Sequence, residues 1–240
     1  DDYRNFDDIM MYVPGPMRSE MEEWIEDEQF DPGYEMTVCV DGELREVRPY
    51  YVSCVMRKVD LTGDKCRKFI NLQTKLHSKE CKDRLLAAVA THDLEKITLP
   101  VRYCSRSTKD YEMTVLKEKS PVNLHSLLVE EDPAEKKRMA VDRYRHHISG
   151  LSSVPVTEAA DGTIITLHPV TNCEQTRISS STSNVLVEVT SSVSVDACQR
   201  VIDCLIERTF LISPEMQVEQ MRIIDNDGNP VNEFTYDLLT

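Results

Sequence analysis

Residues 48–94 carry the pattern that most constrains the fold, because two apolar runs flank one amphipathic segment. Pro49 fixes its own φ and biases the residue before it toward extended backbone. A β-rich run follows, containing Val52, Val55 and Val59. Residues 62–64, Thr-Gly-Asp, predict a turn and a helix N-cap. The helix is indicated by apolar residues at helical spacing: Cys66, Phe69, Ile70 and Leu76.

The second apolar run of this stretch ends in Thr91-His92-Asp93-Leu94. A hydroxyl, an imidazole and a carboxylate therefore stand side by side, and histidine titrates near neutral pH. His92 and Asp93 are the candidate catalytic residues, with Thr91 as a candidate substrate contact. The alternative is a structural corner in which Thr91 or Asp93 caps a short helix over residues 94–97.

The rest of the chain mixes hairpins and helices without a regular βαβ alternation or an internal repeat. Hairpins are predicted over residues 34–47, 154–167 and 217–236, turning at the Asp-Gly pairs 41–42, 161–162 and 227–228. Strands are predicted at 101–105, 111–116 and 185–189, and helices at 123–129, 134–148 and 193–210. The sequence therefore predicts an α+β fold, with residues 1–33 as an acidic arm or linker and residues 34–240 as the domain.

The charge of the chain is uneven. The formal net charge is −14, and residues 1–31 hold eleven acidic residues against two arginines. Residues 57–84 hold nine Lys or Arg against four acids, and residues 136–145 hold five more basic residues. This balance excludes a general nucleic-acid binder. The basic segments are interpreted either as local contacts to an RNA end or as solvated helix faces.

The eight cysteines show no CxxC pair, which favours buried, reduced thiols in a cytoplasmic protein over disulfides or a zinc site. His77 and Cys81 are four residues apart on a predicted helix, but no second ligand pair follows them. No metal or cofactor is expected. No apolar run reaches membrane-spanning length, and the first residue is not Met, which predicts an excised region of a longer protein.

Two further candidates lie near residues 171–190. Glu188 sits between Val187 and Val189, so its side chain points opposite to theirs on a strand. It faces either solvent or a pocket in which a buried carboxylate needs a donor. The polar loop before it carries Asn172, Glu174 and Arg177, and it is either a binding rim or an ordinary surface loop.

Five motifs in order resemble the B3/B4 region of the eukaryotic and archaeal phenylalanyl-tRNA synthetase β subunit. These are Arg48-Pro49 with the aromatic residue after it, Thr91-His92-Asp93-Leu94, His168-Pro169-Val170-Thr171-Asn172, Glu174-Gln175-Thr176-Arg177-Ile178, and Asn184 through Thr190. The resemblance implies a two-subdomain module of mixed and antiparallel sheets with packed helices. Finer features of residues 188–192 and 218–222 resemble animal proteins that carry this module behind leucine-rich repeats.

In the synthetases this module resembles a hydrolytic site that removes tyrosine wrongly attached to phenylalanine tRNA. By motif, His92 matches the family's corner histidine, Asn172 its loop, and Glu188 the acid that would receive a tyrosine hydroxyl. A buried hydroxyl acceptor is a physical means of favouring tyrosine over phenylalanine. This chain departs from the pattern at His168, where the family has proline, and at Gln175-Thr176, where it has His-Ser.

Three functions stay open at this stage. The first is an RNA- or translation-factor-binding module without catalysis, and the second is a working aminoacyl-tRNA ester hydrolase, free-standing or part of a synthetase β subunit. The third is a protein-interaction domain that uses the acidic arm. The expected partners are tRNA or another RNA, a translation factor, or a synthetase α subunit, and neither DNA nor a membrane is expected.

Overall fold

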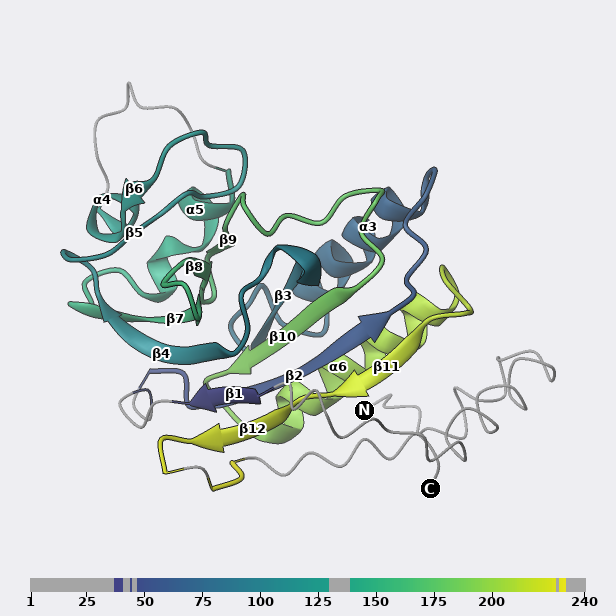
Figure 1. Cartoon of the computed structure of the whole chain (residues 1–240). Coiled ribbons are helices and arrows are strands. Elements are labelled where there is room, and N and C mark those ends of the chain that lie inside the picture. The colour runs from purple at the N-terminus through teal and green to yellow at the C-terminus, as the bar shows by residue number, and fades with distance from the viewer. Residues whose placement is uncertain (1–36, 41–43, 45–46, 130–138, 228, 232–240) are drawn as a thin grey trace. The chain divides into compact units, whose positions relative to one another are not determined.

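The described residues form an α+β fold organised around two sheets (Figure 1). The computed structural model describes residues 37–40 (backbone only), 44, 47–129, 139–227 and 229–231, all within one compact unit, Met36–Phe234. The predicted acidic arm, residues 1–33, lies outside the described residues. Among the described helices, none is long and apolar enough to cross a membrane.

The larger described sheet has six strands in the order β12-β1-β4-β7-β8-β9. β1 pairs in parallel with both β12 and β4, and the strands from β4 to β9 pair antiparallel. The strands span Thr37–Val40 (β1), Val101–Ser107 (β4), Ser153–Ala159 (β7), Ile164–Leu167 (β8), Thr171–Asn172 (β9) and Arg222–Asp225 (β12).

The smaller described sheet has four antiparallel strands in the order β11-β2-β10-β3. They span Tyr50–Arg57 (β2), Ala87–Asp93 (β3), Val185–Ser191 (β10) and Gln217–Gln220 (β11). One face of this sheet is covered by helix α6, Val195–Phe210, which packs on β2, β3 and β10 and also contacts helix α3, Lys65–Ser78 (Figure 1). Ser194 caps α6 by accepting a hydrogen bond from the Ala197 amide at 3.1 Å.

The smaller elements complete the connections. They are the strands β5, Glu112–Met113, and β6, Val122–Asn123; the helices α4, Leu124–Leu128, and α5, Met139–Tyr144; and the 3₁₀ turns η2, Leu94–Lys96, and η3, Arg145–His147. α4 begins after Asn123, whose side chain accepts a hydrogen bond from the His125 amide at 3.0 Å.

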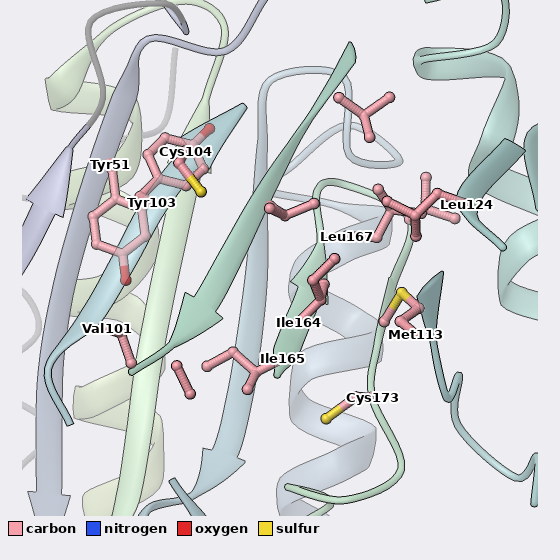
Figure 2. Close-up of a cluster of buried hydrophobic side chains, with 14 of the residues drawn as sticks. Tyr51, Val101, Tyr103, Cys104, Met113, Leu124, Ile164, Ile165, Leu167 and Cys173 are labelled. Atoms are coloured by element: carbon pink, nitrogen blue, oxygen red, sulfur yellow. The ribbon is translucent and has the colours of Figure 1, made fainter. Parts of the chain in front are cut away.

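A core cluster of buried side chains joins strands from both sheets. Tyr51 of β2 and Tyr103 of β4 are both fully buried and stack with ring centroids 4.7 Å apart. Figure 2 shows these two rings side by side at one end of a cluster that continues through Val101, Ile164, Ile165 and Leu167. Because one apolar cluster draws on both sheets, removing either sheet would expose the core of the other.

Several sequence predictions are confirmed at the level of the element. Helix α3 begins after Asp64, and the hairpin of β7 and β8 turns through Gly162 at φ +86°. The helix predicted over 193–210 is α6, and its apolar residues at helical spacing are buried along its length: Cys198, Val201, Ile202, Leu205 and Ile206. The predicted helix over 134–148 is described from residue 139, as α5 followed by η3.

One predicted hairpin, over 34–47, is wrong, and the hairpin predicted over 217–236 is confirmed only after Met221. There Ile224 forms an antiparallel bridge with Pro230, and the Val231 amide donates to the Ile223 carbonyl at 2.9 Å. β1 pairs with β4 and β12, and the described residues after it, Leu44 and Val47, form a turn closed by a hydrogen bond from the Val47 amide to the Leu44 carbonyl. The segment predicted as one strand over 217–224 is divided at Met221, because β11 pairs with β2 in one sheet and β12 with β1 in the other. Met221, 2% exposed, fills the core at the crossing.

Candidate functional site

Strand register places two of the predicted site residues, His92 and Glu188, on the inner face of the smaller sheet. Glu188 on β10 lies opposite Ser53 of β2 and Ala90 of β3. Side chains of alternate residues on a strand share a face. Tyr51 and His92 are each two residues from those positions on their strands, so they share the face of Glu188. The opposite face of the sheet meets α6.

Three side chains donate hydrogen bonds to the Glu188 carboxylate. The Tyr51 hydroxyl donates to Oε1 at 2.8 Å, and the Thr166 hydroxyl of β8 donates to Oε2 at 2.8 Å. His92 Nε2 lies 3.1 Å from Oε2 and 2.8 Å from the Thr166 hydroxyl oxygen. Tyr51, His92 and Glu188 are all 0% exposed. The two carboxylate oxygens are thus occupied by donors from three strands, one of them in the other sheet.

These hydrogen bonds account for a charged carboxylate in the interior. Burial raises the pKa of Glu188, but the hydrogen bond from His92 and the electrostatic interactions with the His168 and His92 rings outweigh burial and lower the pKa to about 2. Burial and the adjacent Glu188 charge raise the pKa of Tyr51 well above its usual range, so this phenol keeps its proton and remains a donor.

His92 is held by hydrogen bonds at both ring nitrogens. Its Nδ1 lies 2.7 Å from the hydroxyl oxygen of Thr176, which also contacts the Cys173 thiol at 3.1 Å. Donation from Nε2 to Glu188 places a proton on Nε2. The family's His-Ser is Gln175-Thr176 in this chain, and the threonine supplies the hydroxyl that orients His92.

His168 fills a second buried position between the sheets. Its Nε2 lies 2.9 Å from the Thr157 hydroxyl, and its Nδ1 lies 3.3 Å from the hydroxyl of Thr190, which accepts a hydrogen bond from Arg48 Nε at 2.7 Å. The His168 ring also meets Tyr103 edge-on, with centroids 5.3 Å apart. Burial lowers the pKa of His168 to about 3, so the imidazole is neutral at pH 7. The residue that replaces the family's first proline is therefore part of the buried polar network.

Thr91 and Asp93 do not join His92. They lie on the opposite face of β3, because neighbouring strand residues alternate. The Thr91 hydroxyl donates to Gln73 of α3 at 3.0 Å, and the Asp93 carboxylate accepts from Thr182 at 2.8 Å and pairs with Lys96. The side-by-side arrangement of the three groups expected from sequence order is wrong, since strand geometry separates His92 from its neighbours.

The predicted rim residues lie outside the buried network. The Asn172 side chain donates to the Thr91 carbonyl at 3.2 Å, which ties β9 to β3. Glu174 pairs with Arg177 at 3.2 Å and accepts from the Lys117 amide at 2.7 Å. The Arg177 side chain is 55% exposed. Of the predicted set, only His92 and Glu188 belong to the buried network.

Sequence reasoning assigned no role to Tyr51, Thr166 or Thr176, which complete the network. The signal for Tyr51 is its spacing: Tyr51, Ser53 and Val55 alternate on β2, so a polar aromatic stands on the core-facing side. Thr166 carries no comparable signal, because its partners come from a sheet paired through distant segments.

The described residues contain no group of three or more His, Cys, Asp or Glu side chains arranged for a metal. His77, considered above as a metal ligand, is buried and accepts a hydrogen bond from the Val89 amide at Nε2, 3.0 Å away. Burial lowers the pKa of His77 to about 3. All seven described cysteines are free thiols, and burial raises the pKa of Cys54 and Cys81.

No family model matches the sequence. Among curated proteins, it is 28% identical to the phenylalanine–tRNA ligase β subunit of Dictyostelium discoideum over 189 residues, which is 79% of this chain and 30% of that protein. It is 29% identical to the human β subunit over 153 residues, 64% of this chain and 25% of that protein. The chain is homologous to part of this subunit. It spans about a third or less of the length of these relatives.

The fold agrees with this homology. An N-terminal fragment of the phenylalanyl-tRNA synthetase β subunit from Pyrococcus horikoshii superposes with a TM-score of 0.71 at 23% identity, covering 80% of this chain and 52% of that fragment. The expected α+β fold, with antiparallel sheets and packed helices, is confirmed.

Proposed function

We propose that this domain is a cytoplasmic RNA- or translation-associated binding module that retains the editing fold without its catalysis. The observation that carries the proposal is the hydrogen bond from Tyr51 to Glu188 Oε1 at 2.8 Å, made with both side chains fully buried. By its resemblance to the synthetases, Glu188 is the acid that would receive the hydroxyl of a bound tyrosyl group. Here a tyrosine of the protein itself makes that contact.

The contact removes the basis of tyrosine selection. A site that selects a hydroxyl-bearing substrate needs a buried acceptor that the protein itself leaves open to the substrate. Glu188 does not provide one, because its carboxylate is fully buried, with Tyr51 donating to Oε1 and Thr166 and His92 donating to Oε2. His92 is fully buried as well, and its two ring nitrogens are engaged with Thr176, Thr166 and Glu188. It is poorly placed to orient a water toward an ester.

The second candidate is an editing hydrolase for tyrosyl-tRNA specific for phenylalanine, alone or within a synthetase β subunit bound to its α subunit. The pairing of His92 with Glu188 at 3.1 Å favours it, because two of the residues that match family motifs meet in the interior. The binding module is favoured by the filled acceptor and by the resemblance to proteins that carry this domain behind leucine-rich repeats. Both candidates place the domain in translation.

Deacylation separates the two functions. Purified protein is mixed with tyrosyl-tRNA for phenylalanine, and release of tyrosine is followed beside a His92→Ala variant and a no-protein control. We expect release at the spontaneous rate in all three, with tRNA binding or capture of a translation factor by the wild-type protein. Turnover by the wild type that is lost in His92→Ala would overturn the proposal and establish the hydrolase.

A second arm tests the role of Tyr51 directly. Tyr51→Ala removes the phenol and leaves Glu188 able to accept a hydroxyl, so p-cresol should raise the melting temperature of this variant and not that of the wild type. Tyr51→Ala/Glu188→Gln is the matched control, with the same cavity and no carboxylate. If p-cresol stabilises the wild type as much as Tyr51→Ala, the site is open and Tyr51 does not fill it.

A further inference from the structure

The solvent-facing side of helix α3 carries a row of basic side chains. Arg67, Asn71, Lys75 and Lys79 follow one another at four-residue spacing and therefore lie along one side of the helix. Lys82 follows in the turn after the helix, and all five are exposed. From Lys65 to Ser78 the helix contains no acidic residue, although the whole chain has a net charge of −14.

The basic residues of this row differ from their neighbours on the same helix. Lys65 and Lys68 form ion pairs with Asp60 and Asp64 before the helix, the second pair at 3.1 Å. Within the part of the chain that the structure describes, no ion pair involves Arg67, Lys75 or Lys82. Asp60 and Asp64 therefore neutralise the lysines at the N-terminal end of α3. The positive charge of the row remains available to a partner.

The turn after α3 holds its charges in a fixed place. Lys82, Asp83 and Arg84 take positive φ values of 47°, 53° and 68°, a costly conformation for three successive L-residues. The Asp83 amide donates to the His77 carbonyl at 2.8 Å, and Arg84 Nη1 donates to the carbonyls of Pro169 and Val170 at 2.7 and 2.9 Å. These hydrogen bonds fix the backbone that presents Lys82 beyond the end of the helix.

The second basic segment of the sequence meets the first at this turn. Arg143 of α5 pairs with the Asp83 carboxylate at 2.7 Å, and the Arg84 guanidinium lies 4.0 Å from the ring centre of Tyr144. Because Arg143 neutralises Asp83, the acid next to Lys82 does not cancel the charge of the row. The described part of the second basic segment, from residue 139, thus lies beside the turn that follows α3.

We propose that the α3 basic face, defined as Arg67, Lys75, Lys79 and Lys82, contacts the phosphate backbone of an RNA. This inference rests on the proposed function and names the surface that would perform it. From Arg67 to Lys79 the row extends roughly 18 Å at 1.5 Å per residue, long enough for several phosphates. Its lysines and arginine can neutralise phosphates by displacing counterions, while the acidic remainder of the chain repels RNA and leaves this face as the approach.

The packing of α3 argues against a membrane surface as the partner. An interfacial helix inserts its apolar side into lipid, but the apolar side of α3 is already used inside the protein, where Phe69, Leu72 and Leu76 are buried. The exposed side offers charge without a comparable apolar stripe. The same packing keeps the row rigid, which lowers the entropic cost of binding.

Charge reversal tests the proposal. Arg67→Glu/Lys75→Glu/Lys82→Glu is compared with Lys109→Glu/Lys117→Glu/Lys119→Glu, which makes the same charge change at exposed lysines interspersed with acids. The control is also matched in backbone, since Lys117 has φ +70° and Lys82 has φ +47°. Binding of a fluorescein-labelled, unmodified tRNA transcript to the full chain is measured by anisotropy between 50 and 200 mM KCl, with circular dichroism to verify folding.

We expect the α3 variant to bind the transcript at least roughly tenfold more weakly at low salt. The slope of its salt dependence should fall by about 0.7 to 0.9 for each phosphate that the face no longer neutralises. The control should stay within about threefold of the wild type. Equal binding of the transcript by the two variants would show that the α3 basic face is not the RNA contact, while RNA binding by the domain would still stand. If the wild type does not bind the transcript, or binds polyglutamate in its place, both the face and RNA as its partner are wrong.

Discussion

Glu188 and Tyr51 come from sequence segments 137 residues apart, yet their contact decides how the interior of this domain is interpreted. A buried carboxylate is costly without donors and acceptable with several. Glu188 accepts hydrogen bonds from Tyr51, Thr166 and His92. The carboxylate can therefore stay ionised in the interior. One carboxylate thereby connects β2 and β3 of the smaller sheet with β8 of the larger sheet.

Removal of the Tyr51 hydroxyl tests this structural role. Tyr51→Phe keeps the ring and its stacking on Tyr103 but leaves Glu188 Oε1 buried with one donor fewer. We expect a loss of about 1–3 kcal/mol in the free energy of unfolding, measured in urea. Tyr50→Phe, on the neighbouring position of β2 and only partly buried, is the matched control and should change stability by less than about 0.5 kcal/mol. Equal losses would contradict the assigned hydrogen bond.

The charge of Glu188 gives a pH dependence of known sign. Its pKa is lowered from 4.5 to about 2 in the folded protein, so the ionised form stabilises the fold above pH 4.5 and that stabilisation is lost as the pH falls toward 2. The stability difference between the wild type and Glu188→Gln should therefore narrow between pH 7 and pH 3, by roughly 2 kcal/mol if the whole shift is realised. Urea unfolding at pH 7, 5, 4 and 3 measures it, with Glu112→Gln as an exposed control. A difference that is constant with pH would contradict a charged, paired Glu188.

Among the helices and strands, the sequence predicted those that are determined by residues close together in the chain. Helix α6, helix α3 and the β7–β8 hairpin were found from apolar spacing and turn residues, which depend on neighbours in the chain. The pairing of β1 with β4 and β12 was not found, since an Asp-Gly pair indicates a turn and carries no information about which distant strand is the partner. The division of the predicted strand 217–224 at Met221 was missed for the same reason.

The residues of the candidate site also fall into those that the local sequence indicates and those that it does not. Glu188 was singled out because its charge interrupts an apolar strand, and His92 because it ends one; both signals are local. Alternation along β3 could have separated Thr91 and Asp93 from His92 had the strand been extended to residue 93. Thr166 became recognisable only through pairing, because its role exists only where strands from two sheets converge.

The N-cap of α6 provides a test at this scale. Ser194 accepts a hydrogen bond from the Ala197 amide at 3.1 Å, whereas the side chain at the N-cap of α3, Asp64, forms no such bond. We expect Ser194→Ala to lower the free energy of unfolding by about 1 kcal/mol and Asp64→Ala to lower it less. Urea denaturation of both variants checks the order. An unchanged stability in Ser194→Ala would show that α6 does not depend on its cap.

At the scale of the whole unit, the chain between α6 and its end connects the two sheets. β11 extends the smaller sheet beside β2, and after Met221 the chain enters the larger sheet as β12 beside β1. The Met221 sulfur accepts a hydrogen bond from the Ser53 hydroxyl at 3.1 Å. Ser53 is the residue of β2 that pairs with Glu188 of β10. The crossing point therefore supports the same strand pair that holds the Tyr51–Glu188 contact.

This connection predicts that the two sheets unfold as one cooperative unit. Met221→Ala leaves a cavity at the crossing, which should cost roughly 2–5 kcal/mol, while Leu211→Ala, at a side chain 66% exposed, should cost little. Amide hydrogen exchange shows which sheet is destabilised. If the sheets share one core, amides of β10 and of β7 lose equal protection from exchange in Met221→Ala. Loss confined to one sheet would mean that the sheets open separately and that the buried carboxylate can become accessible without global unfolding. Since the network around Glu188 takes donors from both sheets, we expect equal loss.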